Sequence, residues 1–357
     1  MDRPNVLLVF SDQHRAATMG YAGGANVQTP HFDRLAGDSL NAEHCVSVVP
    51  VCTPARASLL TGQYPCQHRL LINDIPLEQR GVSVAEAFAT AGYQTGYIGK
   101  WHLNGGGWEA PIEEEARLGF QFWRGWECCH DYTNSRYWAD GKAYSWGGYD
   151  AFAQTNCATD YIAEHADDED PFCLFLSWGP PHDPYDTAPE EFREMYDAEG
   201  MELRANVPDD CAPEAREALA GYCAHVSALD SCMGQIMDCL EDQGIAGNTI
   251  LVYTSDHGDM LYSHGQWTKQ KPWDESVQVP FLLRYPDRFG KEGASVEHPF
   301  NSMDVMPTLL DMAGVEIPDT VDGRSILGRL GESPDAIEHA ALYACFMPMA
   351  SWSTDAG

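Results

Sequence analysis

NVLLVFSDQHR (residues 5–15) is an apolar run that turns abruptly polar. Its apolar part, residues 5–10, is nearly continuous, which indicates a β-strand buried on both faces of a sheet. Four other segments share this character and are separated by helical patterns: QTGYIG (94–99), FCLFLSW (172–178), NTILVYTSD (248–256) and VPFLLRYP (279–286). The sequence therefore predicts an α/β fold with helices on both faces of a central sheet.

Helix starts are marked between these strands. Thr29 before Pro30 is typical of an N-cap followed by proline in the first turn, and Ser83 with Glu86 forms a capping box before VAEAFATAGY. Two longer helical patterns cover about residues 213–244 and 303–314.

The segment 104–153 is rich in glycine and aromatic residues and has no clear period. We expect it to be an irregular insertion and not part of the core sheet. Its aromatic side chains could stack against sugar rings or could form a small satellite core. The candidates are Trp123, Trp126, Tyr132, Tyr137, Trp138, Tyr144 and Trp146.

Composition limits the classes of function. The chain has 357 residues, enough for two domains or one large α/β unit, and its net charge is −33. This acidity argues against nucleic-acid binding, which needs clustered Lys and Arg, and against a membrane-surface role. No secretory leader is evident, and the twelve cysteines are scattered without a C-x-x-C pattern, so we expect a cytoplasmic protein with reduced thiols.

Polar groups follow four of the predicted strands, at the edge where doubly wound proteins place their chemistry. Asp12, Asp256 and His257 offer two carboxylates and an imidazole, and Gln13 could add a carboxamide oxygen. Such a set suits Ca²⁺ or Mg²⁺, although the imidazole leaves Mn²⁺ or Zn²⁺ open. The other two strands lead into Lys100 with His102 and into His182 with Asp183.

CTPARASLLTG (residues 52–62) places a cysteine at the predicted start of a short helix. Backbone amides at a helix N-terminus lower a thiol pKa, so Cys52 could be a nucleophile, or simply a small buried side chain. Arg56 lies one turn further on, where its planar fork could hold an oxyanion.

CTPAR and the following ASLLTGQYP resemble the signature of the sulfatase family, in which the enzyme's own cysteine is oxidised to formylglycine (3-oxoalanine). The resemblance covers roughly residues 4–330, because further blocks follow in the family's order. These blocks are NVLLVFSDQHR, GYIGKWHL, PPHDPY, YTSDHGDML and HGQWTKQKPWDESVQVP.

The resemblance implies an alkaline-phosphatase-like α/β fold with a large, mostly parallel sheet. Residues 1–330 would form the catalytic domain, with 104–153 as its aromatic-rich insertion. Residues 331–357 would begin a C-terminal antiparallel subdomain, which we expect to be truncated. A divalent cation, usually Ca²⁺ with Mg²⁺ or Mn²⁺ as alternatives, would be bound by Asp12, Gln13, modified Cys52, Asp256 and His257.

The resemblance also implies a mechanism for a sulfuric ester hydrolase. The hydrated aldehyde made from Cys52 would attack sulfur, while Arg56, Lys100 and Lys269 hold the charge on the sulfuryl group. His182 or Lys269 would protonate the leaving alcohol. His102 would then take a proton from the second hydroxyl, and sulfate would be expelled.

The implied partners are a small sulfated substrate, with a sulfated carbohydrate favoured, and a formylglycine-generating maturation enzyme; a homo-oligomer stays open. Gln13 and His257 depart from the commoner Asp and Asn and are similar to choline sulfatases and phosphonate monoester hydrolases. A phosphonate monoester or phosphodiester hydrolase is therefore the main alternative. A non-catalytic, truncated anion-binding protein is a third.

Overall fold

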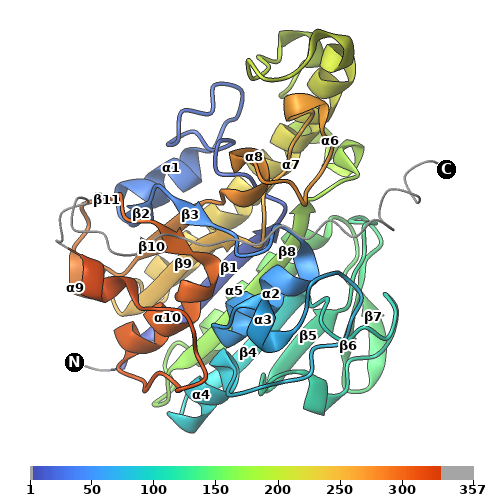
Figure 1. Ribbon diagram of the computed structural model, residues 1–357. Coiled ribbons are helices and arrows are strands. Elements are labelled where there is room, and N and C mark those ends of the chain that lie inside the picture. Colours follow the sequence, from blue (N-terminus) through green and yellow to red (C-terminus); the bar gives the residue numbers. More distant parts are fainter. Residues whose placement is uncertain (1–2, 331–357) are drawn as a thin grey trace.

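The computed structural model describes residues 3–330, which are built around a ten-stranded sheet (Figure 1). In their order across the sheet, the strands are β11 (Ala294–Val296), β2 (Leu40–Ala42), β10 (Phe281–Arg284), β9 (Thr249–Ser255), β1 (Asn5–Asp12), β8 (Phe172–Pro181), β4 (Gln94–Lys100), β5 (Phe122–Trp126), β6 (Arg136–Ala139) and β7 (Lys142–Ser145). β3 (Cys45–Val46) and β12 (Phe300–Asn301) form a separate small parallel pair. Residues 331–357, where the sequence predicts the start of a C-terminal subdomain, lie outside the described range.

The five central strands, β9, β1, β8, β4 and β5, run parallel. Val6 of β1 pairs with Cys173 of β8 on one side and with Ile250 of β9 on the other. Every residue of β1 and β8 is buried, because helices cover both faces of the sheet. The predicted α/β class and all five predicted strands are confirmed.

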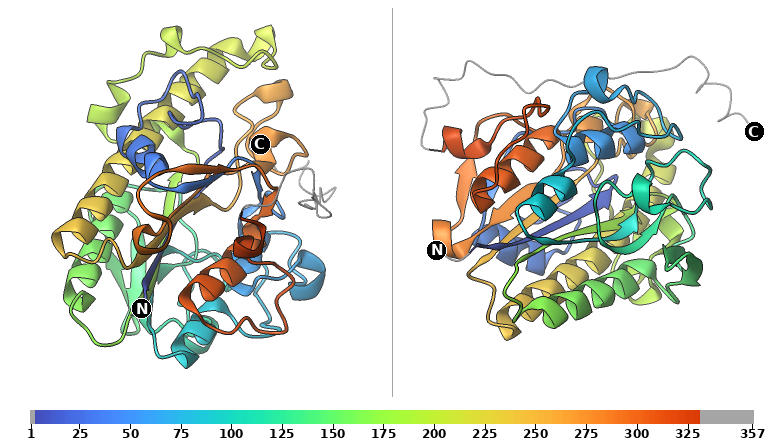
Figure 2. Two further views of the ribbon diagram at one scale, coloured as in Figure 1. Left: turned by 90° about the vertical axis from the view of Figure 1, so that its left-hand side faces the viewer. Right: turned by 90° about the horizontal axis from the view of Figure 1, so that it is seen from below.

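Two layers of helices enclose the sheet, as Figure 2 shows. One layer holds α2 (Cys52–Thr61), α4 (Val84–Thr90) and α10 (Val305–Ala313), and the other holds α1 (Pro30–Gly37), α5 (Asp150–His165) and α7 (Ala212–Asp242). Alternate residues of β1 serve the two layers: Leu8 packs in the first core with Leu309, and Leu7 packs in the second with Met233. Four shorter helices are α3 (Pro65–His68), α6 (Glu190–Arg193), α8 (Asp274–Val277) and α9 (Pro286–Phe289).

The predicted helix starts are confirmed at α1 and α4. Ser83 and Glu86 make both hydrogen bonds of the capping box. Thr29 stands at the N-cap of α1, but its hydroxyl accepts from the Gly20 amide and donates to Asp33 instead of capping the helix.

The expectation that 104–153 stays out of the core sheet is wrong. Residues 122–126 form β5 and pair parallel with β4, and β6 and β7 extend the sheet further. Trp123 of β5 packs on Tyr97 of β4 and is a core residue. The strand was missed because this aromatic-rich segment shows no clear period in the sequence.

No helix within residues 3–330 is both long enough and apolar enough to cross a membrane. The cysteines in the same range all carry free thiols.

Candidate active site

Four parallel strands end at one edge of the sheet and deliver polar side chains there. Asp12 ends β1 and Lys100 ends β4, while Asp256 directly follows β9 and His182 directly follows β8. Parallel strands in adjacent positions have their carboxyl ends together, so residues distant in sequence meet. The predicted convergence is confirmed.

A buried cluster of potential metal ligands lies at this edge. Each of Asp12, Cys52, Asp256 and His257 offers one ligand atom, and these atoms all lie within 4.8 Å of one another. Cys52 Sγ is 3.3 Å from His257 Nε2 and 3.7 Å from Asp12 Oδ1. Carboxylate and imidazole groups this close, with no exposure to water, suit a divalent cation.

Gln13 completes this set. Its Nε2 donates to Asp259 Oδ2 at 2.7 Å, and its backbone amide donates to Asp256 Oδ1 at 3.1 Å. The carboxamide oxygen Oε1 is buried and has no hydrogen-bond partner. A buried acceptor without a donor is costly unless a ligand satisfies it, so the donor set fits a cation.

Two basic side chains hold the carboxylates of the cluster. Arg56 donates from Nε to Asp256 Oδ2 at 3.0 Å and from a terminal nitrogen to Asp12 Oδ2 at 3.3 Å. Lys100 Nζ lies 2.5 Å from Asp12 Oδ2. Burial and the nearby Cys52 raise the pKa of Asp12, but Lys100, His182 and Lys269 together outweigh them and hold that pKa well below its usual range.

Arg56 has little freedom to reach a substrate. Its remaining hydrogen bonds go to the Lys100 carbonyl at 2.7 Å and to Ser177 Oγ at 2.8 Å, and it is almost fully buried. In this arrangement its guanidinium braces the two carboxylates. Direct contact of Arg56 with the sulfuryl group stays a prediction.

Cys52 begins α2, as expected, and lies among cations. Lys269 Nζ is 3.3 Å and Lys100 Nζ is 3.8 Å from its sulfur. Burial raises the pKa of the thiol, yet Lys100, Lys269 and His257 together bring it well below the ordinary value. An anionic atom at residue 52 is therefore favoured.

Two further histidines stand beside residue 52. Lys269 Nζ and His182 Nε2 are 2.6 Å apart, and His182 Nδ1 is 2.8 Å from the Asp183 carbonyl. His102 bonds through Nε2 to Asp74 Oδ1 at 3.1 Å, and its Nδ1 is buried without a geometric partner. The structure thus brings together all the catalytic and metal-binding candidates that the sequence predicts.

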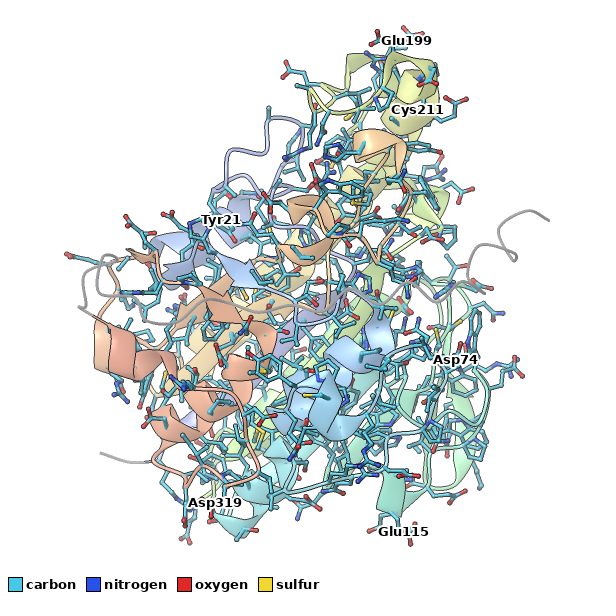
Figure 3. The ribbon with its side chains drawn as sticks, viewed as in Figure 1. Tyr21, Asp74, Glu115, Glu199, Cys211 and Asp319 are labelled. Carbon is cyan, nitrogen blue, oxygen red and sulfur yellow. The ribbon has the colours of Figure 1, made fainter. Side chains whose placement is uncertain are left out.

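Three side chains near the site have no recognisable signal in the sequence: Asp74, Trp108 and His130. Asp74 lies on the loop after α3 (Figure 3) and bonds both His102 and Trp108. The ring of His130 stacks on His182 with centroids 4.3 Å apart, and Trp108 packs against it at 5.0 Å. Burial lowers the pKa of His130 to about 2, so this ring is neutral.

The aromatic residues of the insertion differ in burial. Trp123, Trp126 and Tyr132 are buried and form packing contacts, as a core would. Trp108 is 47% exposed and packs against His130, whose ring stacks on His182. This exposed ring is not among the seven aromatic residues that the sequence suggested for sugar stacking.

Comparison with known proteins gives a consistent result. A family model described as "Sulfatase" matches residues 4–315. The ulvan-active sulfatase of Formosa agariphila is 40% identical over 93% of this chain, and this chain spans 66% of that relative.

Solved structures agree on the fold. The structure of BT4656 in complex with its substrate D-glucosamine-2-N,6-O-disulfate superposes on this chain with a TM-score of 0.87. The two sequences are 25% identical, and the match covers 97% of this chain and 84% of the other. Phosphonate monoester hydrolase from Silicibacter pomeroyi gives 0.77 at 27% identity, over 94% and 78%.

Proposed function

This chain belongs to the sulfatase family, and we propose that it is a sulfuric ester hydrolase whose substrate is a sulfated carbohydrate. The observation that carries the proposal is the position of Cys52. Its sulfur lies within 3.8 Å of two lysine ammonium groups, beside a histidine and a carboxylate suited to a metal. Cationic groups around one buried atom fit a reaction that gathers negative charge there.

We infer that Cys52 is converted to formylglycine and that Asp12, Gln13, residue 52, Asp256 and His257 would hold a divalent cation, with Ca²⁺ expected. When bound, the cation would supply positive charge that favours an ionised hydroxyl on residue 52 and binds the sulfate group. The free oxygen of Gln13 supports this ligand set.

The surrounding residues have separate tasks in this proposal. Lys100 and Lys269 hold the charge on the transferred group, since both ammonium groups face residue 52. The pair of His182 and Lys269 supplies the proton that the departing alcohol needs. His102, whose side chain interacts with the Cys52 thiol, accepts a proton from the remaining hydroxyl.

A cavity of about 830 Å³ supports a sugar as the alcohol part of the ester. Asp183, next to His182, and Trp267, two residues before Lys269, are among its lining residues, so it begins near the catalytic groups. Rings of this kind stack on sugars, and carboxylates accept bonds from hydroxyl groups. The remaining aromatic and acidic residues of the lining are Tyr185, Tyr196, Tyr262, Asp186, Asp197, Glu214 and Glu217.

This lining favours a neutral sugar unit beside the sulfated one, because only Arg193 opposes the carboxylates. The similarity to a relative named as ulvan-active and to a structure holding a sulfated glucosamine supports the same substrate class.

The test is mass spectrometry of the Cys52 peptide after co-expression with a formylglycine-generating enzyme, together with turnover of an aryl sulfate and of sulfated oligosaccharides. We expect an aldehyde at residue 52 and turnover that Cys52→Ala abolishes. Cys66→Ala, at an exposed cysteine, is the matched control and should keep full activity. Full turnover by Cys52→Ala would refute the proposal.

A phosphonate monoester or phosphodiester hydrolase is the second candidate. Gln13 and His257 in the proposed metal set and the fit to a phosphonate monoester hydrolase structure favour it. Paired assays with sulfate, phosphodiester and phosphonate esters of one leaving alcohol separate the two. A higher kcat/KM for the sulfate ester is expected.

A further inference from the structure

We propose that Asp74 is a positioning residue that fixes the tautomer of His102, leaving Nδ1 of that ring as the proton acceptor for residue 52. The inference rests on the proposed function, because it assigns a partner to the base of the second half-reaction. It concerns a residue that has no sequence signal and does not touch the proposed metal ligands.

The first observation is the two-sided environment of His102. The side chain is 3% exposed, and its Nε2 bonds Asp74 Oδ1 at 3.1 Å, while Nδ1 is buried and unpartnered. The His102 carbonyl accepts from Thr53 Oγ1 at 2.8 Å, which ties this residue to the one that follows Cys52. One ring nitrogen is thus bonded to Asp74, and the other is left for the side of Cys52, with whose thiol the His102 side chain interacts.

The chemistry of the partner decides which nitrogen carries the proton. An ionised carboxylate only accepts hydrogen bonds, so the Nε2 of His102 must donate. A neutral imidazole with hydrogen on Nε2 has its lone pair on Nδ1. The bond from His102 is also the leading cause that lowers the pKa of Asp74, which keeps this carboxyl ionised.

A second set of contacts holds Asp74 in place. Trp108 Nε1 donates to the same oxygen, Asp74 Oδ1, at 3.1 Å. The neighbouring Asn73 accepts the Thr53 amide at 2.9 Å, so the loop is bonded to the first turn of α2. Asp74 itself has a φ of 63°, a left-handed conformation that only a few residue types adopt easily. Loop, helix and insertion therefore converge on this carboxylate.

His102 serves the release of sulfate from residue 52. After the S–O bond to the alcohol has broken and the alcohol has left with a proton, residue 52 carries one sulfate ester and one hydroxyl. The hydroxyl proton moves to His102 Nδ1, and the electron pair of the former O–H bond forms the C=O bond of the aldehyde. The C–O bond to sulfate breaks at the same time, and its electrons leave with the sulfate. Water then adds to the aldehyde, and His102 returns its proton to solvent. The sum is ester plus water giving alcohol plus hydrogen sulfate.

Asp74→Asn tests the assignment with little change in shape. The amide can donate to Nε2, which moves the ring proton to Nδ1 and removes the acceptor. For metal-loaded protein carrying formylglycine, we expect kcat to fall about 10- to 100-fold with an aryl sulfate. This is less than the roughly 10⁴-fold loss for a buried triad carboxylate, because the side chain of Asp74 is 58% exposed.

The half-reactions distinguish positioning from a general structural defect. Rapid mixing should show a burst of about one alcohol per site in Asp74→Asn, and peptide mass spectrometry after acid quench should find sulfate on residue 52. Trp108→Phe, which removes only the second bond to Asp74, should show a smaller effect in the same direction. Asp170→Asn, which breaks the exposed ion pair with Arg3, is the matched control and should be unchanged. Wild-type kcat in Asp74→Asn, or a slow variant without a burst, overturns the proposal.

A direct readout does not depend on turnover. ¹⁵N-histidine NMR of the metal-free full chain in a Cys52→Ser background, with His102→Gln to assign the signal, reports which ring nitrogen is protonated. We expect hydrogen on Nε2 of His102, and a shift toward the Nδ1 form in Asp74→Asn. If no sulfate ester is turned over by any form, the proposed function fails; this spectrum still decides the role of Asp74. Hydrogen on Nδ1 with Asp74 intact overturns it.

Discussion

The thiol of Cys52 would be a weak acid in a solvated peptide. In this protein its charged neighbours lower the pKa of the thiol. Lys100 and Lys269 come from positions 48 and 217 residues away along the chain, and both approach the sulfur. The metal-type residues Asp12 and Asp256 are recognisable because Asp12 ends one apolar strand and Asp256 directly follows another. Asp74 follows no such strand, and no local pattern shows that it meets His102.

Asp259 should influence metal binding because it orients the side chain of Gln13. Its Oδ2 accepts from Gln13 and from the Tyr185 hydroxyl, and its Oδ1 accepts from the Leu261 amide at 2.9 Å. Asp259→Asn offers one accepting oxygen instead of two, so the orientation of the Gln13 carboxamide is lost. We expect metal affinity to fall about 10- to 100-fold by titration calorimetry.

Asp311→Asn, on the exposed side of α10, is the control for Asp259→Asn and should bind metal as the wild type does. Unchanged affinity in Asp259→Asn would mean that Gln13 is not a ligand.

At the scale of elements, the α2 helix places the site by where it starts and stops. It begins at Cys52, every residue from 52 to 61 is buried, and Gly62 ends it with a φ of 64°. A helix buried on all sides cannot shift without disturbing both the sheet and α10. Its two ends therefore fix the position of residue 52.

Gly62→Ala should destabilise the protein more than Gly314→Ala. Both glycines end helices in the left-handed conformation, at φ values of 64° and 69°. A Cβ at position 62 would lie 2.8 Å from Val321 Cγ1, whereas a Cβ at 314 meets nothing within 4 Å. Chemical denaturation should show a loss of about 1 kcal/mol for Gly314→Ala and a larger loss for Gly62→Ala. Equal losses of stability in the two variants would show that the Val321 side chain can move away from a Cβ at position 62 without destabilising the protein.

Asp150, the first residue of α5, should make the stability of the protein depend on pH. Burial raises the pKa of Asp150 to about 7, above the ordinary carboxyl value, and its Oδ1 is unpartnered. The folded state thus holds this proton more tightly than the unfolded state. Its contribution to stability is present below about pH 4 and is lost as pH rises to about 7.

Asp150→Asn cannot titrate, so we expect it to be more stable than the wild type at pH 8, by on the order of 1–3 kcal/mol, with the difference shrinking toward pH 4. Denaturation across this range measures the difference. Asp160→Asn, exposed on the same helix, should show no such trend. A difference that does not vary with pH would contradict the raised pKa.

At the scale of the whole molecule, net charge is the dominant feature. A charge of −33 on 357 residues produces self-repulsion, while the site collects two of the five lysines, Lys100 and Lys269. The site therefore presents positive groups within a negative molecule, which suits a small anionic ester more than a long polyanion.

Salt should raise thermal stability by screening this repulsion. From about 0.01 M to about 1 M NaCl the Debye length falls from about 30 Å to about 3 Å. We expect Tm to rise by several degrees and then to level off. Sucrose at matched osmolality controls for solute exclusion and should give a smaller, non-saturating rise. A Tm that is flat or falls with NaCl would contradict the prediction.

The sequence by itself determined the α/β class, the strand ends that carry Asp12, Lys100, His182 and Asp256, and the helix that begins at Cys52. Each of these has a local signal, since apolar runs, caps and polar strand ends act over a few residues. Only the tertiary structure decided that residues 122–126 join the sheet, that Arg56 braces two carboxylates, and that Asp74 meets His102 and Trp108. These contacts join segments far apart in the chain, and their geometry is set by packing across the sheet, which no local pattern encodes.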